Sequence, residues 1–512
     1  MCGGAAGVAR GPVAVTGFFE RVRRHGLWAL ALLLVGITGP PVAAAPSGTY
    51  RIAPAPDLSA IDVRACFAAP VTLRPLDPRG LAYLDGLRVE QPPDPVRWLG
   101  DVQSVSLEEG CLVFRFDLQR ALEEAGRRAR RVGEDVMLSP NLLLWLPSEA
   151  RSGPHVVHLA LPAGIQASVP WPELEEGPGL HRYVPGPRGW QPIVVFGHPR
   201  LRALQVGDTR LRLVLLDGLE SGDAGRIEDW LRSAASTLLT VTGSFPVPRP
   251  QVLVVPTSRR GTRSAVPFAR VLRDGGTAVQ FYVNPGLERD SLTRDWTAAH
   301  EFAHLLLPFV DQRDAWISEG FASYYQNVLR ARAGVVSEER AWRDLAAGFE
   351  RGRRGAVDGR FSVTLRSSMA GAGKNRSMRR YWTGAAVALI ADLELRTRAD
   401  EGPRSLDDVL AQLAACCLPS ERSWGGRELF ERLDVLASTE LFVPLYDRMV
   451  QSCAFPELAQ AWERLGLEVD GRSVRVVEAS SRLRAAIMGA RAEADAYAPG
   501  GVTQGEASEP RG

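Results

Sequence analysis

The sequence predicts an α+β fold in which a β-rich N-terminal region, a mixed α/β region and a helical C-terminal region follow one another. Three observations lead to this prediction. Short alternating apolar runs separated by prolines and glycines fill 50–197, strand and helix patterns alternate over 211–255, and the sequence is mostly helical in character from 292 to about 467. With 512 residues, the chain is long enough for several domains, each with its own core.

The amino-acid composition is that of an ordinary soluble globular protein. Hydrophobic residues make up 45% of the chain and charged residues 23%, and the formal net charge is +2. A chain this close to neutral lacks the basic surplus that attracts nucleic acid, and it offers no general attraction to a strongly acidic partner. We therefore expect no nucleic-acid partner.

Residues 1–44 are predicted to be a secretory signal peptide. Arginines within 21–24 precede an apolar run over 27–37, and small residues at 42–44 follow that run. A retained membrane anchor is the alternative, but eleven apolar residues are short for crossing a bilayer. We expect cleavage after Ala44, which leaves a periplasmic or secreted protein without stable membrane insertion.

Export of the chain affects how its cysteines are interpreted. Five cysteines remain after cleavage, and an oxidising compartment permits disulfides between them. Cys66 and Cys111 both lie in strand-like stretches and are candidates for one bond. Cys453 is a candidate partner for Cys416 or Cys417. Buried free thiols are the alternative.

Residues 45–200 are expected to form the β-rich domain, followed by a mixed domain over 201–340. Strands of the first domain are expected around 63–67, 111–116, 156–161 and 191–196, with one helix over 118–131. In the second domain we expect strands at 211–216 and 251–255 and a helix over 224–242.

The helical C-terminal domain is expected over 341–475. A helical tail follows over 476–512, and its last part from 499 is predicted to be disordered because it has almost no core-forming residues.

The strongest chemical signal is the motif HEFAH at 300–304. A helix places residues four apart on one face, so His300 and His304 can present two imidazole nitrogens to a single metal ion. Glu301 then lies beside the open coordination position, where it can accept a proton from water. A helical histidine pair held by carboxylates without any metal is the alternative.

The surroundings of this motif support a helix and supply a further ligand. Ser291 or Thr293 can cap the start of the helix, and Pro308 follows its end. Catalytic zinc takes three protein ligands. The stretch WISEGFASYY at 316–325 begins a second helix, and a turn between the two helices would bring Glu319 back beside the histidines.

HEFAH followed by WISEGFASYY resembles the gluzincin metallopeptidases. It most resembles the glycyl aminopeptidase family, in which HExxH is followed by a W-x-S-E-G-F-x-S-Y-Y helix. YWTG at 381–384 and SLDDVL at 405–410 are similar to later segments of that family. The likeness covers roughly 140–470, and it implies that 201–340 is a thermolysin-like α/β zinc catalytic domain.

The resemblance also implies a set of roles. His300, His304 and Glu319 match the zinc ligands, Glu301 matches the general base, and Tyr381 matches the tyrosine that donates to the developing oxyanion. Zn2+ is the implied cofactor and a peptide or protein the implied substrate, hydrolysed in a cleft between the β-rich and helical domains. A catalytically silent peptide-binding or scaffold protein with the same fold is the alternative.

The sequence departs from the family at three places. The segment between His304 and Glu319 is shorter than usual, and Thr383 replaces a lysine of the family. Residues 274–280 take the place of a glycine-rich edge strand that ends in an amine-binding glutamate, and no acidic residue follows their Gly-Gly pair. Asp274 is a candidate substitute, although a turn-forming Asp-Gly is the simpler interpretation. Aminopeptidase and endopeptidase activity therefore both stay open.

Overall fold

The computed structural model of the chain describes residues 48–91, 97–100, 102–148, 155–177, 180–185, 193–257, 264–273, 275–285, 289–356, 364–369, 374–398, 404–420, 422–477 and 482–489. The predicted signal peptide, the predicted disordered end and Asp274 lie outside these residues. Within them, no helix combines the length and the apolar character needed to cross a membrane.

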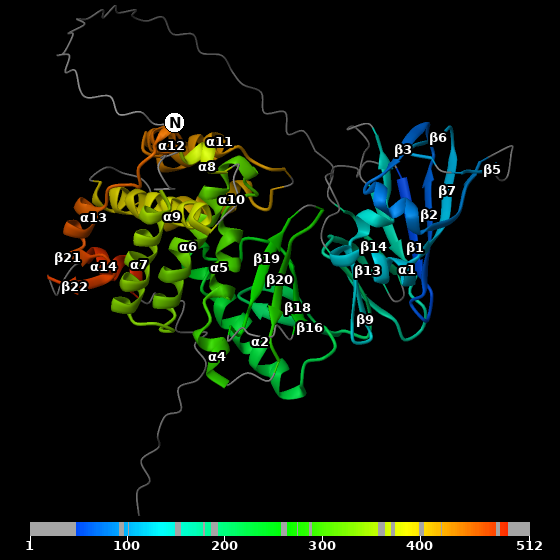
Figure 1. The fold of residues 1–512 in the computed structure, drawn as a ribbon, viewed down its shortest axis with the longest axis horizontal. Coiled ribbons are helices and arrows are strands. Elements are labelled where there is room, and N and C mark those ends of the chain that lie inside the picture. The colour runs from blue at the N-terminus through cyan, green and yellow to red at the C-terminus, as the bar shows by residue number, and fades with distance from the viewer. Residues whose placement is uncertain are drawn as a thin grey trace, which may run out of the picture.

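Three parts of the molecule lie side by side along its long axis (Figure 1). A β-rich part is at one end, a five-stranded sheet with its helices is in the middle, and a bundle of helices is at the other end. The predicted order of β-rich, mixed and helical regions is therefore confirmed.

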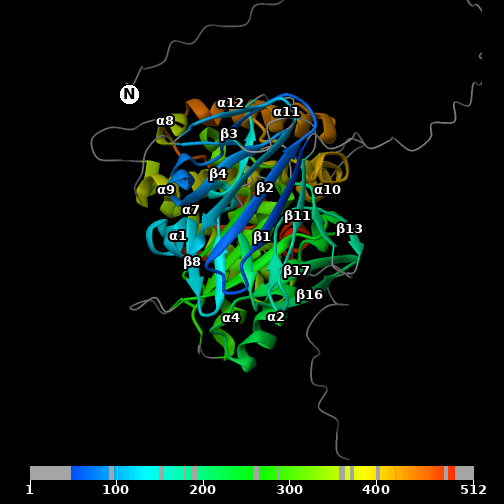
Figure 2. The same ribbon diagram turned by 90° about the vertical axis from the view of Figure 1, so that its right-hand side faces the viewer.

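The β-rich part contains three sheets, and the largest faces the viewer in Figure 2. The strand orders are β13-β14-β11-β1-β2-β7-β4-β5, β10-β3-β6 and β12-β15-β9-β8. The strands are β1 (Gly48–Pro54), β2 (Ala60–Phe67), β3 (Val71–Pro75), β4 (Leu84–Glu90), β5 (Arg97–Trp98), β6 (Val105–Leu107), β7 (Gly110–Asp117), β8 (Ala129–Val132), β9 (Asp135–Leu138), β10 (Trp145–Pro147), β11 (His155–Leu159), β12 (Gln166–Ser168), β13 (Glu173–Gly177), β14 (Leu180–Tyr183) and β15 (Val194–Gly197). Burial alternates along β2 and β7, as expected for a sheet with one face on a core.

Within the described residues, two disulfides are seen, and they join four cysteines. Cys66 and Cys111 face each other in the β2–β7 register and are bonded. Cys416 is bonded to its neighbour Cys417. The predicted pairing of Cys453 with one of these two is therefore wrong, because each sulfur takes part in only one disulfide.

The helix predicted over 118–131 is shorter than expected. Helix α1 (Leu118–Glu124) ends before Gly126, whose φ of 60° places it in the left-handed region that glycine adopts most easily. The rest of the predicted helix becomes a short 3-10 turn and then β8, where Ala129 and Val132 face a core.

The middle part is built on a sheet with the order β16-β17-β18-β20-β19. Its strands are β16 (Arg200–Val206), β17 (Thr209–Leu215), β18 (Gln251–Pro256), β19 (Phe268–Leu272) and β20 (Ala278–Val283). The three inner strands are parallel, and the edge strands β16 and β19 are antiparallel to their neighbours. Strand β18 is a nearly continuous buried apolar run because both faces of the sheet are covered.

Different parts of the molecule pack against the two faces of this sheet. The helices beside it are α2 (Ser221–Ser236), α3 (Leu239–Thr242), α4 (Arg289–Arg294) and α5 (Thr297–Ala303). Helices α2 and α5 share one core with inner-strand residues such as Val252 and Phe281. On the opposite face, Val214 and Leu253 pack against Val132 and Val195 of the β-rich part.

The single helix predicted over 224–242 is broken in two. The chain leaves α-helical geometry after Ser236, where the Leu238 amide bonds to the carbonyl three residues back. The Thr237 and Thr240 hydroxyls also donate to carbonyls three residues back. Side chains of this kind compete with the regular helical ladder.

The helical part consists of α6 (Ala315–Arg332), α7 (Glu338–Ala356), α8 (Leu365–Met369), α9 (Lys374–Thr397), α10 (Leu406–Cys417), α11 (Gly426–Ala437), α12 (Phe442–Gln451), α13 (Ala459–Arg464) and α14 (Arg482–Met488). A hairpin of β21 (Leu467–Asp470) and β22 (Ser473–Val476), which the sequence did not predict, lies between α13 and α14.

Buried polar contacts tie three helices of this part together. Tyr324 of α6 donates to Asp392 of α9 at 2.7 Å, and Tyr325 donates to Asp407 of α10 at 2.9 Å. Arg332 at the end of α6 forms a buried ion pair with Asp407 at 2.8 Å. Since breaking such a buried network leaves unpaired charges, the relative positions of α6, α9 and α10 are strongly constrained.

Candidate metal centre

Helix α5 presents two histidines to a cavity, one turn apart. His300 lies in the last turn of α5, and His304 follows at its end, where the chain passes into a 3-10 turn. Their rings lie 4.8 Å apart, centroid to centroid. The helix starts later than predicted, because Asp295 accepts a hydrogen bond from the Thr297 amide at 2.7 Å. The predicted caps, Ser291 and Thr293, belong instead to α4, while the end before Pro308 is as predicted.

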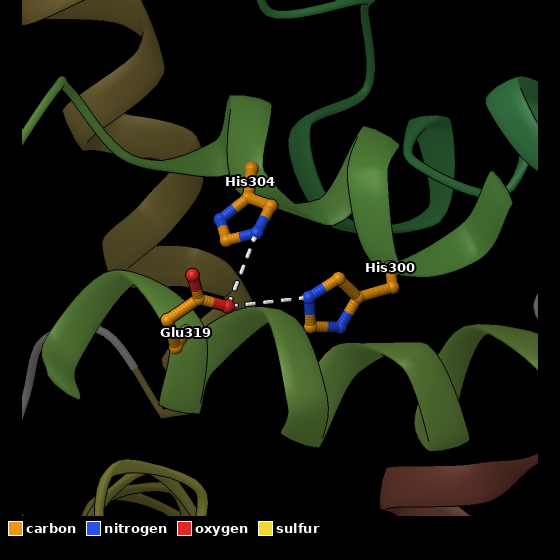
Figure 3. A group of neighbouring side chains, drawn as sticks. All are labelled: His300, His304 and Glu319. Atoms are coloured by element: carbon orange, nitrogen blue, oxygen red, sulfur yellow. Dashed lines mark ion pairs between the residues drawn. The ribbon is translucent and has the colours of Figure 1, made fainter. Parts of the chain in front are cut away.

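Helix α6 returns Glu319 to these histidines, as Figure 3 shows. Its Oε2 atom lies 3.4 Å from Nε2 of His300 and 3.6 Å from Nε2 of His304. Ligand atoms of the three residues all lie within 4.8 Å of one another, and within the described residues they form the only such group. The structure thus brings together the three residues predicted as metal ligands.

The donor set fits zinc. Buried Glu319 Oε2 has no hydrogen-bond partner, and an orphaned buried carboxylate oxygen is costly unless a cation or donor satisfies it. Two imidazole nitrogens and one carboxylate oxygen are a known ligand set of catalytic zinc, which leaves a position for water.

The second nitrogen of each histidine also has a partner. His300 Nδ1 lies 3.1 Å from Gln326 Oε1, and His304 Nδ1 lies 3.0 Å from Ser318 Oγ. The amide oxygen of Gln326 can only accept, so His300 carries its proton on Nδ1 and turns a bare Nε2 toward Glu319. Such contacts orient ligand rings toward a metal.

The pKa values of all three ligands are shifted, and that of His300 is raised because its contacts with Glu319 and Glu301 outweigh its burial. Burial alone would raise the pKa of Glu319, but the two neighbouring histidines outweigh it and lower that pKa to about 2. Burial lowers the pKa of His304 to about 3. An ionised carboxylate beside a neutral imidazole is the protonation state in which these groups bind metal.

Glu301 is the buried acid next to this group. It lies in the same cavity, which has a volume of about 320 Å³, and its side chain is not among the three that converge. Burial raises the pKa of Glu301 to about 7. A carboxyl group with this pKa can both take up and release a proton near neutral pH.

Tyr381 of α9 also lines the cavity. Its ring lies 5.9 Å from that of His300 with only 21° between the planes. Burial raises its pKa, and the charge of Glu319 adds to this, so the phenol keeps its proton at physiological pH and remains a donor. All five residues predicted for the site therefore line one cavity.

Two expectations about the walls of the cavity are wrong. Its lining residues all lie between Phe268 and Tyr381, so within the described residues the β-rich domain contributes no wall. The edge strand is also not at 274–280. Gly275 and Gly276 form a turn with φ of 80° and 153°, and the residues after them belong to β20, which is paired on both sides. The edge strand is β19, which precedes the glycines.

Sequence reasoning missed Ser318, Gln326 and Arg273. The first two lie on α6 one residue before and seven residues after Glu319, so helical periodicity around a ligand could have indicated them. Arg273 lines the cavity and donates to the carbonyls of His304 and Leu307 at the end of the α5 segment. Burial lowers its pKa to about 10, which leaves it a cation.

The chain is similar to known proteins in part of its sequence and in its fold. Residues 309–386, which include Glu319 and Tyr381, match the sequence model of the M61 glycyl aminopeptidase family. An aminopeptidase N family protein from Idiomarina loihiensis has a similar fold, with a TM-score of 0.60 and 15% identity over 83% of this chain and 79% of that one. An M1 zinc metallopeptidase from Deinococcus radiodurans aligns with a TM-score of 0.49 and 17% identity, over 81% of this chain and 95% of that one. No curated protein sequence matches the chain.

The matched family segment indicates a peptidase, and the structural neighbour shows that the fold is that of an aminopeptidase N family protein. Within that class, the matched segment is that of the glycyl aminopeptidases, which confirms the resemblance predicted from the sequence.

Proposed function

We propose that the chain is a zinc-dependent peptidase that hydrolyses peptide bonds with water, and that its middle part is a thermolysin-like catalytic domain. The observation that carries this proposal is the convergence of His300, His304 and Glu319 around an orphaned carboxylate oxygen, with Glu301 and Tyr381 in the same cavity. We keep the predicted domain limits 45–200, 201–340 and 341–475 as part of the proposal.

The ligands and their partners prepare the site for the reaction. Ser318 and Gln326 hold the two imidazoles in one orientation, so little reorganisation is needed when a substrate arrives. A zinc ion held by His300, His304 and Glu319 supplies Lewis-acid chemistry to the scissile carbonyl and to the attacking water.

Glu301 is the proton carrier in this proposal. Its carboxylate accepts a proton from the attacking water as the new bond to the carbonyl carbon forms. It then delivers that proton to the leaving amine as the peptide bond breaks. The same residue serves both steps because it is buried in the cavity without being needed as a ligand.

Tyr381 is proposed to stabilise the transition state. A carbonyl under attack gathers negative charge on its oxygen, and a phenol aimed at that oxygen binds the transition state more strongly than the ground state. Its ring stacks on that of His300, and the residue lines the cavity.

A digest of a broad peptide library tests this function. Purified full-length protein loaded with zinc should cleave library peptides, and a chelator should stop cleavage until zinc is restored. Blocking the peptide N-termini separates two activities, because an aminopeptidase then loses its substrates and an endopeptidase does not. Zinc binding without cleavage of any peptide would contradict the proposal and favour a scaffold protein.

We also propose that the protein acts outside the cytoplasm, in the periplasm or as a secreted protein. The signal-like residues 1–44 support this location. So does the Cys66–Cys111 disulfide, because such bonds persist in oxidising compartments. Comparing the mass of the mature protein with that of the full chain tests cleavage after Ala44.

A further inference from the structure

Strand β19 contributes one part of the cavity wall. It is the last strand of the five-stranded sheet and pairs only with β20 within the described part of the chain. Residues of β19 and the segment after it line the same cavity as the metal ligands and Tyr381. The charges on this strand therefore act directly on whatever occupies the cavity.

Those charges are all positive. Arg270 and Arg273 line the cavity, and neither forms an ion pair with a carboxylate in the described part of the chain. Arg270 donates from Nε to the amide oxygen of Gln280 at 2.9 Å. Arg273 donates to the carbonyl oxygens of His304 and Leu307. A guanidinium has five N–H donors, so both side chains keep donors for a ligand.

Among the described residues of the same wall, no acidic group is placed to hold a substrate ammonium. The sequence has no Asp or Glu between Asp229 and Asp274, a stretch that includes all of β19. The acidic residues that line the cavity are Glu301 and Glu319, and both already have roles at the metal centre. Among the residues that the structure describes around the cavity, a substrate cation would meet two guanidinium groups and no carboxylate that is free of a role at the metal centre.

We propose that this cavity selects substrates that carry a carboxylate within a residue or two of the scissile bond, and that Arg270 and Arg273 bind that carboxylate. The proposal deepens the proposed peptidase function and rests on it for the position of the cut. Arginine pairs with carboxylates through parallel N–H donors, and such charged hydrogen bonds are stronger in a partly buried site than in water. The carboxylate can be an acidic side chain or the C-terminus of a peptide.

Binding tests this proposal independently of cleavage. The full-length protein carrying Glu301→Gln is loaded with zinc and titrated with fluorescent peptides, followed by fluorescence anisotropy. One pair of acetylated and amidated peptides differs only in Glu against Gln beside the cut. A second pair is neutral and differs only in a free or an amidated C-terminus. These two arms separate a side-chain carboxylate from a terminal one.

We expect the carboxylate member of at least one pair to bind about tenfold or more tightly than its amide counterpart. Adding Arg270→Gln should reduce that ratio to below about threefold, and Arg270→Glu should make a lysine peptide the better ligand. Arg202→Gln, on the opposite edge strand β16, is the matched control and should leave the ratio unchanged. Arg273 is tested by Arg273→Lys, with circular dichroism to confirm that the end of α5 is still folded.

The possible outcomes separate the two proposals. Equal binding within both pairs, or no binding of any peptide, overturns carboxylate selection. If the ratio of carboxylate to amide affinity is unchanged in both Arg270→Gln and Arg273→Lys, the assignment of the carboxylate site to β19 and the segment after it is overturned. A preference for carboxylates in binding, together with wild-type protein that cleaves none of these peptides, contradicts the peptidase function and leaves carboxylate selection standing.

Discussion

Gly320 of α6 and Gly384 of α9 lie directly against each other where the two helices cross. A Cβ atom built on Gly384 would overlap the carbonyl oxygen of Trp316 and lie 2.8 Å from the Cα of Gly320. Glu319 precedes Gly320, and Tyr381 lies one turn before Gly384. The close crossing of these helices therefore brings the third metal ligand and the proposed oxyanion donor to the same cavity.

Substituting Gly384→Ala should push α6 and α9 apart. Overpacking of a tight contact costs about 1–3 kcal/mol, and the free energy of unfolding should fall by this amount or more. Hydrolysis should fall further than stability alone explains, because Glu319 and Tyr381 move apart. Urea unfolding followed by circular dichroism measures the first effect, and peptide cleavage well below the unfolding midpoint measures the second.

Gly225→Ala is the matched control for this substitution. Gly225 lies in α2 and is exposed, and a methyl group added there would meet no atom within 4 Å. Alanine is favoured over glycine in a helix by up to about 1 kcal/mol, so this change should leave stability unchanged or raise it slightly. Equal effects of the two substitutions would show that the helix crossing is not tight.

Ser318→Ala and Gln326→Leu should each weaken zinc binding. Both remove the hydrogen bond that orients a histidine ring, at 3.0 Å for His304 and 3.1 Å for His300. Loss of such a partner lowers metal affinity by about 10- to 100-fold. Competition with a chromogenic chelator measures the affinity, and Ser233→Ala in α2 serves as the control. Unchanged affinity in both variants would mean that packing alone holds the imidazoles.

The parts of the site that sequence reasoning found are those set by short-range periodicity. His300 and His304 are four residues apart in the sequence, and Glu319 lies near the start of the next helix, so local spacing indicates their approach. Tyr381 needed the family resemblance, because a distance of more than sixty residues along the chain carries no geometric information. The family resemblance identified Tyr381, and the close crossing of α6 and α9 explains why this residue reaches the same cavity as Glu319.

The edge strand was misplaced for a related reason. Both 268–272 and 278–283 are apolar runs next to a Gly-Gly turn, and nothing in their composition says which one lies at the edge of the sheet. That depends on the parallel pairing of β20 with β18, a long-range contact. The helix predicted over 118–131 failed differently, because Gly126 adopts a left-handed conformation inside a helix-like pattern.

Tyr381→Phe should lower kcat while KM stays nearly the same. The ring remains stacked on His300, and only the hydroxyl is lost. Removing one oxyanion donor typically costs about 10²- to 10³-fold in kcat, and an interaction made only in the transition state does not contribute to KM. Steady-state kinetics on a peptide found in the library digest measures both constants. Tyr83→Phe in the β-rich part is the control, and an equal loss there, or a loss confined to KM, would remove Tyr381 from the oxyanion role.

Glu301→Gln should retain zinc and lose hydrolysis. Glutamine has nearly the same shape as glutamate but cannot accept the proton of the attacking water, and loss of a general base costs about 10²- to 10⁴-fold in rate. Zinc content should be unchanged, because the three converging ligand groups do not include Glu301. Elemental analysis of the purified variant and kcat on the same peptide are the two measurements.

The pair of measurements is needed because either one alone has two explanations. Loss of activity together with loss of zinc would make Glu301 a structural or ligand residue, and the proton-transfer role would fail. Zinc retention with full activity would require another base, yet the other acidic residue that lines the cavity is Glu319, which is itself a proposed ligand. Glu463→Gln on the exposed side of α13 controls for the charge change. Glu301 is supported as the base only if its variant binds zinc but is inactive, while Glu463→Gln keeps full activity. The reason is structural: Glu301 is buried in the cavity but is not one of the metal ligands, and a base must be placed in this way.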